Sequence, residues 1–188
     1  TGILSNEDTL LNDVSGSIES DNTALKADSS VIKNNGTIDG IITAVYGENS
    51  NIMNNGSIKS SDTAVRAVNG QYLENAGKIE SSNNGVEIVS GVNLFSNHFK
   101  NSGNIYAENK SVKFYGENNV LELSGDSDIK GNIDGGTGEN ILILNGNINL
   151  NDSTADNFNK LVAIGNTVFN GTVNLSPSNN SSYYTETF

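Results

Sequence analysis

Residues 135–143 read GGTGENILI and approximate the nonapeptide G-G-x-G-x-D-x-U-x, a repeat that binds Ca²⁺. Asn140 stands where that repeat carries its metal-binding aspartate, and no second copy adjoins it. Ca²⁺ takes roughly six to eight oxygen ligands, with strong carboxylates among them. The stretch therefore favours a structural glycine turn, and we expect neither a metal ion nor another cofactor there.

A second oxygen-rich spot is the pair Asp126 and Asp128, in the stretch GDSD. Aspartates in polar turns are mostly exposed to solvent, where water satisfies their charge. We therefore expect this pair to be solvated rather than to bind a metal.

The residue types needed for catalysis are present but scattered. His98 is the only histidine, it falls in an irregular stretch, and no serine has a nucleophile-elbow context. Asp62 and Glu80 could approach each other across neighbouring coils as a glycosidase pair, but nothing favours this pair over others. The only arginine, Arg66, is expected to point outward. The sequence thus predicts that the chain is not an enzyme.

Composition excludes several other classes of function. The chain of 188 residues has 22 acidic and 10 basic side chains and a formal net charge of −12, which repels nucleic acid and anionic lipid surfaces. It has no cysteine, so disulfides and thiolate metal sites are excluded. The run at 141–144 is among the longest apolar stretches, whereas a transmembrane helix needs about 20 apolar residues. We expect no nucleic-acid partner and no membrane-embedded segment.

A repeat of about 20 residues must position all these side chains. It is marked by five glycines spaced 20, 20, 21 and 26 residues apart, namely Gly16, Gly36, Gly56, Gly77 and Gly103. Isoleucine follows two residues after each glycine, and apolar or small residues recur nine and eleven residues after it, the spacing of one face of a strand. No helical stripe persists. Short units that cannot bury a face alone must stack, so the sequence predicts an all-β, right-handed parallel β-solenoid.

Asparagine precedes most of these glycines by two residues, at Asn34, Asn54, Asn75 and Asn101. Stacking of the coils would place these amides one above another, as a hydrogen-bonded ladder at a partly buried turn. We expect the following glycine to supply the positive φ that Asn-Gly turns commonly need. The stretches at 35–37 and 55–57 also read as N-glycosylation acceptors, but turn chemistry is the preferred interpretation. In the first copy, Asn12 is displaced, which predicts a one-residue bulge.

The chain is predicted to form one domain, a β-solenoid over 1–188 that belongs to a longer surface protein. Its more regular coils span about 12–115, and glycine-rich coils with longer strands span about 116–175. Six extra residues lie between Ile88 and Phe99, so residues 89–98 are predicted to form a protruding loop. Its Leu94, Phe95 and His98 are candidate binding residues, although this apolar content could equally fold back over the adjacent strands.

The NNG-x-I units, and the series IKGNIDGGTGENILILNG at 129–146, resemble the β-helix repeats of passenger domains of type V autotransporters of Gram-negative bacteria. The resemblance covers roughly residues 12 to 175. It implies secretion through a C-terminal outer-membrane β-barrel that this sequence does not contain, and hence a location outside the cell, tethered to the bacterial surface. The family has no universal active-site motif, so no catalytic residue carries over.

The resemblance implies a cell-surface adhesin or virulence-factor segment. In such a segment the solenoid is a stalk that presents loops to host-cell proteins, to glycans or to other bacteria. Two alternatives remain open from the sequence: a carbohydrate-active β-helix enzyme, and a structural spacer whose binding region lies elsewhere.

Overall fold

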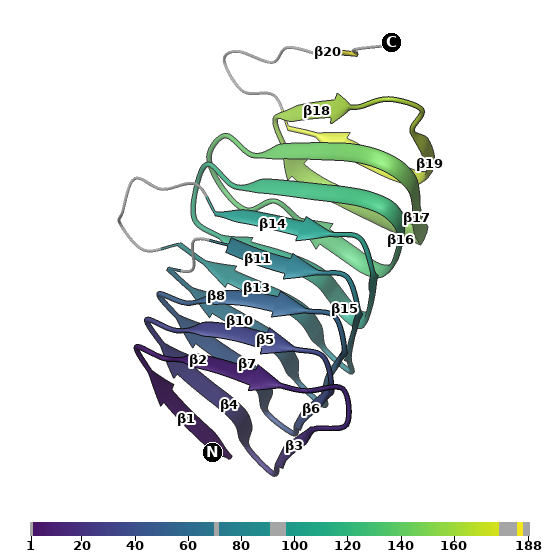
Figure 1. Ribbon diagram of the computed structural model, residues 1–188. Coiled ribbons are helices and arrows are strands. Elements are labelled where there is room, and N and C mark those ends of the chain that lie inside the picture. Colours follow the sequence, from purple (N-terminus) through teal and green to yellow (C-terminus); the bar gives the residue numbers. More distant parts are fainter. Residues whose placement is uncertain (1, 70–71, 91–96, 177–183, 186–188) are drawn as a thin grey trace.

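The computed structural model describes residues 2–69, 72–90, 97–176 and 184–185. Their strands run parallel and stack as a β-solenoid of about eight turns, which confirms the predicted all-β solenoid and its coil length (Figure 1). Each early coil contributes a strand to each of three sheets, and the chain passes from the second sheet to the third and then to the first. Among the described residues, no helix is long and apolar enough to cross a membrane.

The short strands fall into the three sheets according to their parallel pairings. The first sheet holds β1 (Ile3–Asn6), β4 (Thr23–Asp28), β7 (Thr43–Glu48), β10 (Thr63–Val68) and β13 (Asn84–Val89). The second sheet holds β2 (Thr9–Asn12), β5 (Val31–Asn34), β8 (Asn51–Asn54), β11 (Tyr72–Asn75), β14 (His98–Asn101), β18 (Lys160–Ala163) and β20 (Tyr184–Thr185). The third sheet holds β3 (Ser17–Ser20), β6 (Thr37–Gly40), β9 (Ser57–Ser60) and β12 (Lys78–Ser81).

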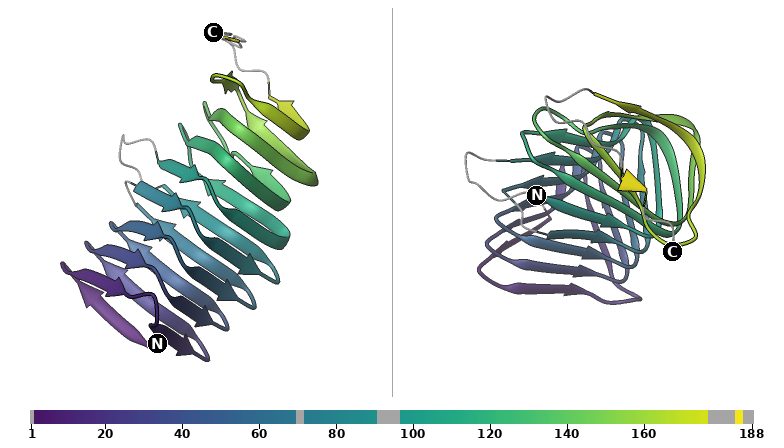
Figure 2. Two further views of the ribbon diagram at one scale, coloured as in Figure 1. Left: turned by 45° about the vertical axis from the view of Figure 1, so that its right-hand side comes forward. Right: turned by 90° about the horizontal axis from the view of Figure 1, so that it is seen from above.

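Later coils use long strands that bend through the corners and so belong to more than one sheet (Figure 2). These strands are β15 (Asn104–Tyr115), β16 (Val120–Asp134), β17 (Ile141–Phe158) and β19 (Val168–Leu175). The change from short to long strands begins in the coil that contains Gly103. The predicted change of unit near residue 116 therefore falls inside this region.

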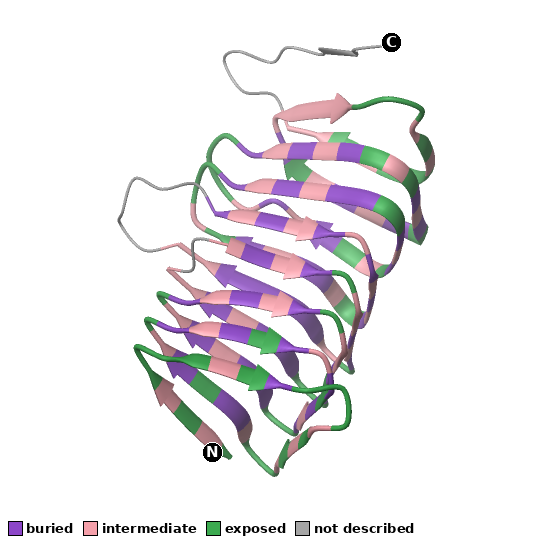
Figure 3. Ribbon diagram, viewed as in Figure 1, coloured by how far each residue is buried: buried purple, intermediate pink, exposed green. Residues whose placement is uncertain are grey.

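The core is a set of rows that run along the solenoid axis, because each inward position pairs in register with its equivalent in the next coil. Val65, for example, pairs with Val45 on one side and Val86 on the other, and all three are fully buried. Buried residues alternate with partly or fully exposed ones along many strands (Figure 3). The predicted inward positions two, nine and eleven residues after each glycine are confirmed, except that Ile18 near the first coil is only partly buried.

The predicted asparagine ladder is confirmed and is one residue longer than expected. The side-chain amide of Asn12 donates to Asn34, and the bonds continue through Asn54 and Asn75 to Asn101, each 2.7 Å long. The five side chains lie at the corner between the second and third sheets and are at most 5% exposed. The register of Asn12 with Asn34 and of Ser17 with Thr37 leaves two extra residues in the first copy, so the prediction of a one-residue bulge is wrong.

The glycines beside the ladder are needed for a reason other than the predicted one. Gly36, Gly56 and Gly77 do not have a positive φ. A Cβ on Gly56 would instead meet the carbonyl oxygen of Gly36 in the coil below, because the backbones stack too closely there for a side chain. In the early coils positive φ occurs at the corner between the first and second sheets, where Ser29 has 51° and Asn49 has 50°.

Candidate functional site

The two oxygen-rich stretches are tied into contacts between coils. Asn140 is fully buried, and its side-chain oxygen accepts from the backbone and side-chain amides of Asn119, 3.0 and 2.9 Å away. Asp126 accepts from Asn147 at 2.8 Å, and Asp128 accepts from Tyr106, Asn149 and Asn151. Among the described residues, no group of three or more histidine or acidic side chains is placed to hold a metal ion.

The candidate glycosidase pair is likewise divided between different partners. Asp62 lies in the turn after β9 and accepts from the amide of Asn83 at 2.6 Å. Glu80 lies on the outer face of β12 and forms an ion pair of 2.6 Å with Lys78. Each carboxylate thus has its own partner on the surface.

His98 is the one candidate loop residue that the structure describes, and its placement in a loop is wrong. It begins β14 and pairs in register with Tyr72 and Val120, because the second sheet continues through this position. On the outer face its ring contacts Tyr72 edge-on, with centroids 6.0 Å apart, and Nε2 lies 3.6 Å from a carboxylate oxygen of Glu122. Val89 also belongs to a strand, β13. Leu94 and Phe95 lie outside the described residues.

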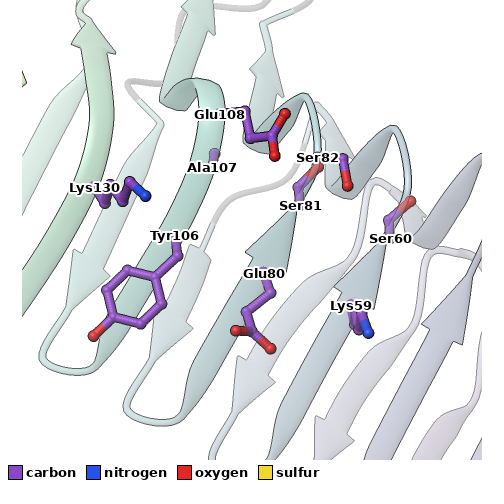
Figure 4. A pocket seen from close by; sticks show the side chains of 9 residues that line it. All are labelled: Lys59, Ser60, Glu80, Ser81, Ser82, Tyr106, Ala107, Glu108 and Lys130. Carbon is purple, nitrogen blue, oxygen red and sulfur yellow. The ribbon is translucent and has the colours of Figure 1, made fainter.

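A groove on the outer face of the third sheet is lined by lysine, glutamate, serine and tyrosine side chains. It crosses four consecutive strands, β9, β12, β15 and β16, and has a volume of about 280 Å³. Figure 4 shows two rows of side chains, one on the strands and one where the chain turns toward the first sheet. The strand row is Lys59, Glu80, Tyr106 and Lys130, and the corner row is Ser60, Ser81, Ser82, Ala107 and Glu108. We call this the third-sheet groove.

Tyr106 is held in a defined position within the third-sheet groove. Its hydroxyl donates to Asp128 at 2.5 Å, and the Lys78 ammonium lies 5.6 Å from the ring centroid. The bond to Asp128 is the main reason that the pKa of Tyr106 rises to about 12, and burial adds to the shift. The same bond is the largest cause that lowers the pKa of Asp128 from its ordinary value. The pair is therefore a neutral phenol bound to a carboxylate at neutral pH.

Several polar groups in the groove are available to a ligand. Lys59, Lys130 and Glu108 are exposed, and the described part of the chain offers none of them a hydrogen bond or an ion pair. The buried hydroxyls behave differently, since Ser60 donates to the carbonyl of Ile41 at 3.2 Å and Ser81 donates to that of Asp62. The serines shape the corner, whereas the exposed ammonium and carboxylate groups face solvent.

The phase of the repeat contained the signal for the strand row. Three residues after each marker glycine lies an outward position, occupied in successive coils by Glu19, Asp39, Lys59, Glu80 and Tyr106. The sequence therefore predicts which side chains share a row. It does not predict a hollow there, because the hollow depends on how the corner serines and the later bent strands shape the surface.

Comparisons of the chain with protein-family models, with curated proteins and with solved structures find no match. The geometry of the coils and of the third-sheet groove therefore carries the functional proposal.

Proposed function

We propose that this chain is a segment of a bacterial cell-surface adhesin of the type V autotransporter kind, and that it acts without catalysis. The solenoid is a stiff stalk whose outer faces and loops contact host-cell proteins or glycans. In this proposal the segment lies outside the cell, tethered to the outer membrane by another part of a longer protein.

The observation that carries the proposal is that each candidate catalytic carboxylate is bound to another side chain of the solenoid. Asp62, Glu80, Asp126 and Asp128 each accept from or pair with a neighbouring side chain. A general acid or base needs free access to a proton on the substrate. Asp62, Asp126 and Asp128 instead bind side chains of a neighbouring coil, and Glu80 pairs with Lys78 of its own strand. The regular stacking of about eight coils supports the same interpretation, because a parallel solenoid presents long uniform faces rather than one deep pocket.

A combined adhesion and hydrolysis assay tests the proposal. The 188-residue chain, labelled with a fluorophore, is added to cultured epithelial cells, and in parallel it is incubated with a panel of soluble polysaccharides. We expect saturable cell binding and no release of reducing ends. Release of reducing ends by the purified chain would support the β-helix enzyme instead. Absence of cell binding would support the structural spacer.

Exposure on the bacterial surface is tested separately. Brief protease treatment of intact cells that produce the full-length protein should remove the segment, while a periplasmic marker survives. Full protection of the segment until the cells are lysed would contradict the proposed location.

A further inference from the structure

We infer that the third-sheet groove binds a linear, uncharged oligosaccharide that lies along the solenoid axis with one sugar ring on Tyr106. This inference rests on the proposed adhesive function and names the class of ligand that one face of the stalk would take.

The shape of the groove sets the direction of the ligand. Its lining comes from four neighbouring strands, and strands in a sheet lie about 4.8 Å apart, so the first and last strands are separated by roughly 14 Å. A volume of about 280 Å³ is close to the lower end for small-ligand sites. A short run of sugar units laid across the strands fits both observations.

Tyr106 supplies a fixed apolar surface. The hydroxyl is committed to Asp128 at 2.5 Å, so the ring does not need to be ordered when a ligand arrives. Rigid tyrosine rings bind with little loss of conformational entropy, and a ring face can pack against the C–H groups of a sugar. The Lys78 ammonium near the ring is itself paired with Glu80 at 2.6 Å, which fixes this side of the groove.

The remaining polar groups suit a ligand rich in hydroxyls. Lys59 and Lys130 can donate hydrogen bonds, Glu108 can accept them, and the hydroxyl of Ser82 can do either. None of these four side chains is engaged elsewhere within the described part of the chain. Donors and acceptors on both borders of the groove match the paired donor and acceptor character of sugar hydroxyls.

The charge of the groove argues for an uncharged ligand. Lys59, Lys78 and Lys130 are balanced by Glu80, Glu108 and Asp128 in and beside the groove, and the whole chain carries a formal net charge of −12. An anionic glycan would be repelled by the molecule as a whole and would find no excess of positive charge in the groove. A cationic ligand gains no excess of negative charge there either.

Titration calorimetry with defined probes tests the inference. The probes are linear hexasaccharides of glucose, mannose and N-acetylglucosamine, the matching disaccharides, and a heparin hexasaccharide as the anionic comparison. We expect at least one uncharged hexasaccharide to bind saturably and more tightly than its disaccharide, because the longer chain reaches more of the four strands. Failure of every uncharged hexasaccharide to bind, or tighter binding of the heparin hexasaccharide, would overturn the inference.

Tyr46 offers a matched control for Tyr106. It is also a partly exposed tyrosine on an outer face, with the Lys26 ammonium 5.3 Å from its ring centroid, but it lies in the first sheet, away from the groove. Tyr106→Ala should weaken binding of the hexasaccharide about tenfold, whereas Tyr46→Ala should leave it within about twofold of the unmodified chain. If Tyr106→Ala does not fold, the exposed double variant Lys59→Ala with Lys130→Ala should weaken the same binding. Equal affinities of the folded groove variant and the control would contradict the inference.

Cell adhesion by the same proteins separates this inference from the proposed function. Adhesion that is lost in the groove variants and kept in Tyr46→Ala supports both. Adhesion that is unchanged in the groove variants leaves the adhesin proposal standing and ends the assignment of the groove. Hexasaccharide binding without any cell adhesion would support the groove and contradict the adhesive function.

Discussion

The early and late coils of this solenoid each have a buried asparagine ladder at a corner, but the two ladders lie at different corners. In the early coils a fully stacked asparagine ladder occupies the corner between the second and third sheets, and it ends where Asn101 donates to the Ser127 hydroxyl at 3.3 Å. In the late coils a second ladder occupies the corner between the first and second sheets, and it links Asn97, Asn119, Asn140 and Asn159. Both ladders pass through one coil, which contains Asn97 and Asn101.

Bonds from asparagine to an aspartate of the neighbouring coil occur on both outer surfaces, and more of them lie on the late coils. On the late coils an aspartate in one coil accepts from an asparagine in the next, as Asp126 does from Asn147, Asp134 from Asn157 and Asp156 from Asn174, over 2.7 to 2.8 Å. On the early coils outward rows mix charges, so that Arg66 pairs with the buried Glu87 at 2.8 Å. Parallel stacking places equal positions one above another, and it brings like charges together at Glu19 and Asp39 in the early coils and at Asp134 and Asp156 in the late coils. Bonds to asparagine, such as those from Asn157 to Asp134 and from Asn174 to Asp156, offset the repulsion in the late coils.

The comparison teaches that a buried polar ladder is required, while the corner that holds it can change. A bend exposes backbone groups that need partners inside the solenoid. When the first ladder ends, its corner is taken over by bent strands with glycines of positive φ, such as Gly125 at 62° and Gly146 at 135°. Beside Gly125 the buried Ser127 still donates to the carbonyl of Asn101, and in the next coil the buried Ile148 takes the same position, so this corner becomes apolar from there on.

The largest expected loss of stability comes from placing a charge in the apolar core, which the early and late coils share. Val65 and Ile133 occupy the same fully buried row of the first sheet, in an early and a late coil. Val65→Asp and Ile133→Asp each bury an unpaired charge and should lower the free energy of unfolding by about 4 kcal/mol or more. Urea unfolding measures this, with the exposed substitution Lys33→Asp as control. A tolerated Val65→Asp would contradict the solenoid core.

The next effect breaks each ladder separately. The amide of Asn54 serves Asn75, Gly56 and Lys78, and that of Asn119 serves Asn140, Gly116 and Gly135. Asn54→Leu and Asn119→Leu should each destabilise the chain by about 2–4 kcal/mol, because buried partners lose their bonds. The control is Asn55→Leu, an exposed neighbour of Asn54 that should change stability by at most about 0.5 kcal/mol. Equal melting shifts for Asn54→Leu and Asn55→Leu would remove the ladder as a source of stability.

A smaller effect distinguishes the two kinds of glycine. Gly56→Ala drives a Cβ into the backbone of the coil below and should cost about 1–3 kcal/mol, and Gly56→Asn should be no better. Gly125→Ala places a Cβ in ordinary van der Waals contact with Ser102 but at an unfavourable φ, at a cost of about 1 kcal/mol. Gly125→Asn should recover part of that loss, because asparagine tolerates this conformation. Thermal melting of the four variants checks the contrast, and rescue of Gly56 by asparagine would contradict it.

The smallest effect is the pH dependence of the bond between Tyr106 and Asp128. The pKa of Asp128 is lowered, so its contribution to stability is present above the ordinary pKa of an aspartate and is lost as pH falls through the lowered value. The pKa of Tyr106 is raised to about 12, so its contribution is complete below about pH 10 and is lost as pH rises toward 12.

Tyr106→Phe tests this pair. Ultraviolet titration should show that the substitution removes the tyrosine that ionises near pH 12, and the melting temperature should fall slightly at pH 7. The difference in melting temperature should vanish in strong acid, where Asp128 is protonated in both proteins. An unchanged titration at high pH would show that the bond is absent in solution.

The sequence was sufficient to predict the fold because stacking gives equivalent residues of successive coils the same environment. The same kind of residue therefore recurs at each inward position. The phases of the isoleucines and valines, and the ladder from Asn34 to Asn101, followed directly from that repetition. The second ladder was not foreseen, because Asn119, Asn140 and Asn159 follow no marker glycine at a fixed distance. The sequence also did not predict why glycine is needed beside the ladder. The reason is the close approach of stacked backbones, which a single coil does not reveal.

The candidate site was less predictable than the fold. A loop at 89–98 was predicted from the length of the stretch alone, and Val89 and His98 at its ends are strand residues. Binding by Leu94 and Phe95 stays a prediction. The third-sheet groove depends on how the corner serines and the bent late strands shape the surface, and sequence phase does not contain that information.

Exchange of the asparagine side-chain amides with solvent tests the two-ladder account most directly. In a sample labelled with ¹⁵N at asparagine side chains, the Nδ2 protons of Asn34, Asn54, Asn75, Asn119 and Asn140 should exchange far more slowly than those of exposed Asn55 and Asn170. Slow exchange should appear in both sets, because each ladder is buried and bonded on both sides. Uniformly fast exchange of all these amides would contradict the account.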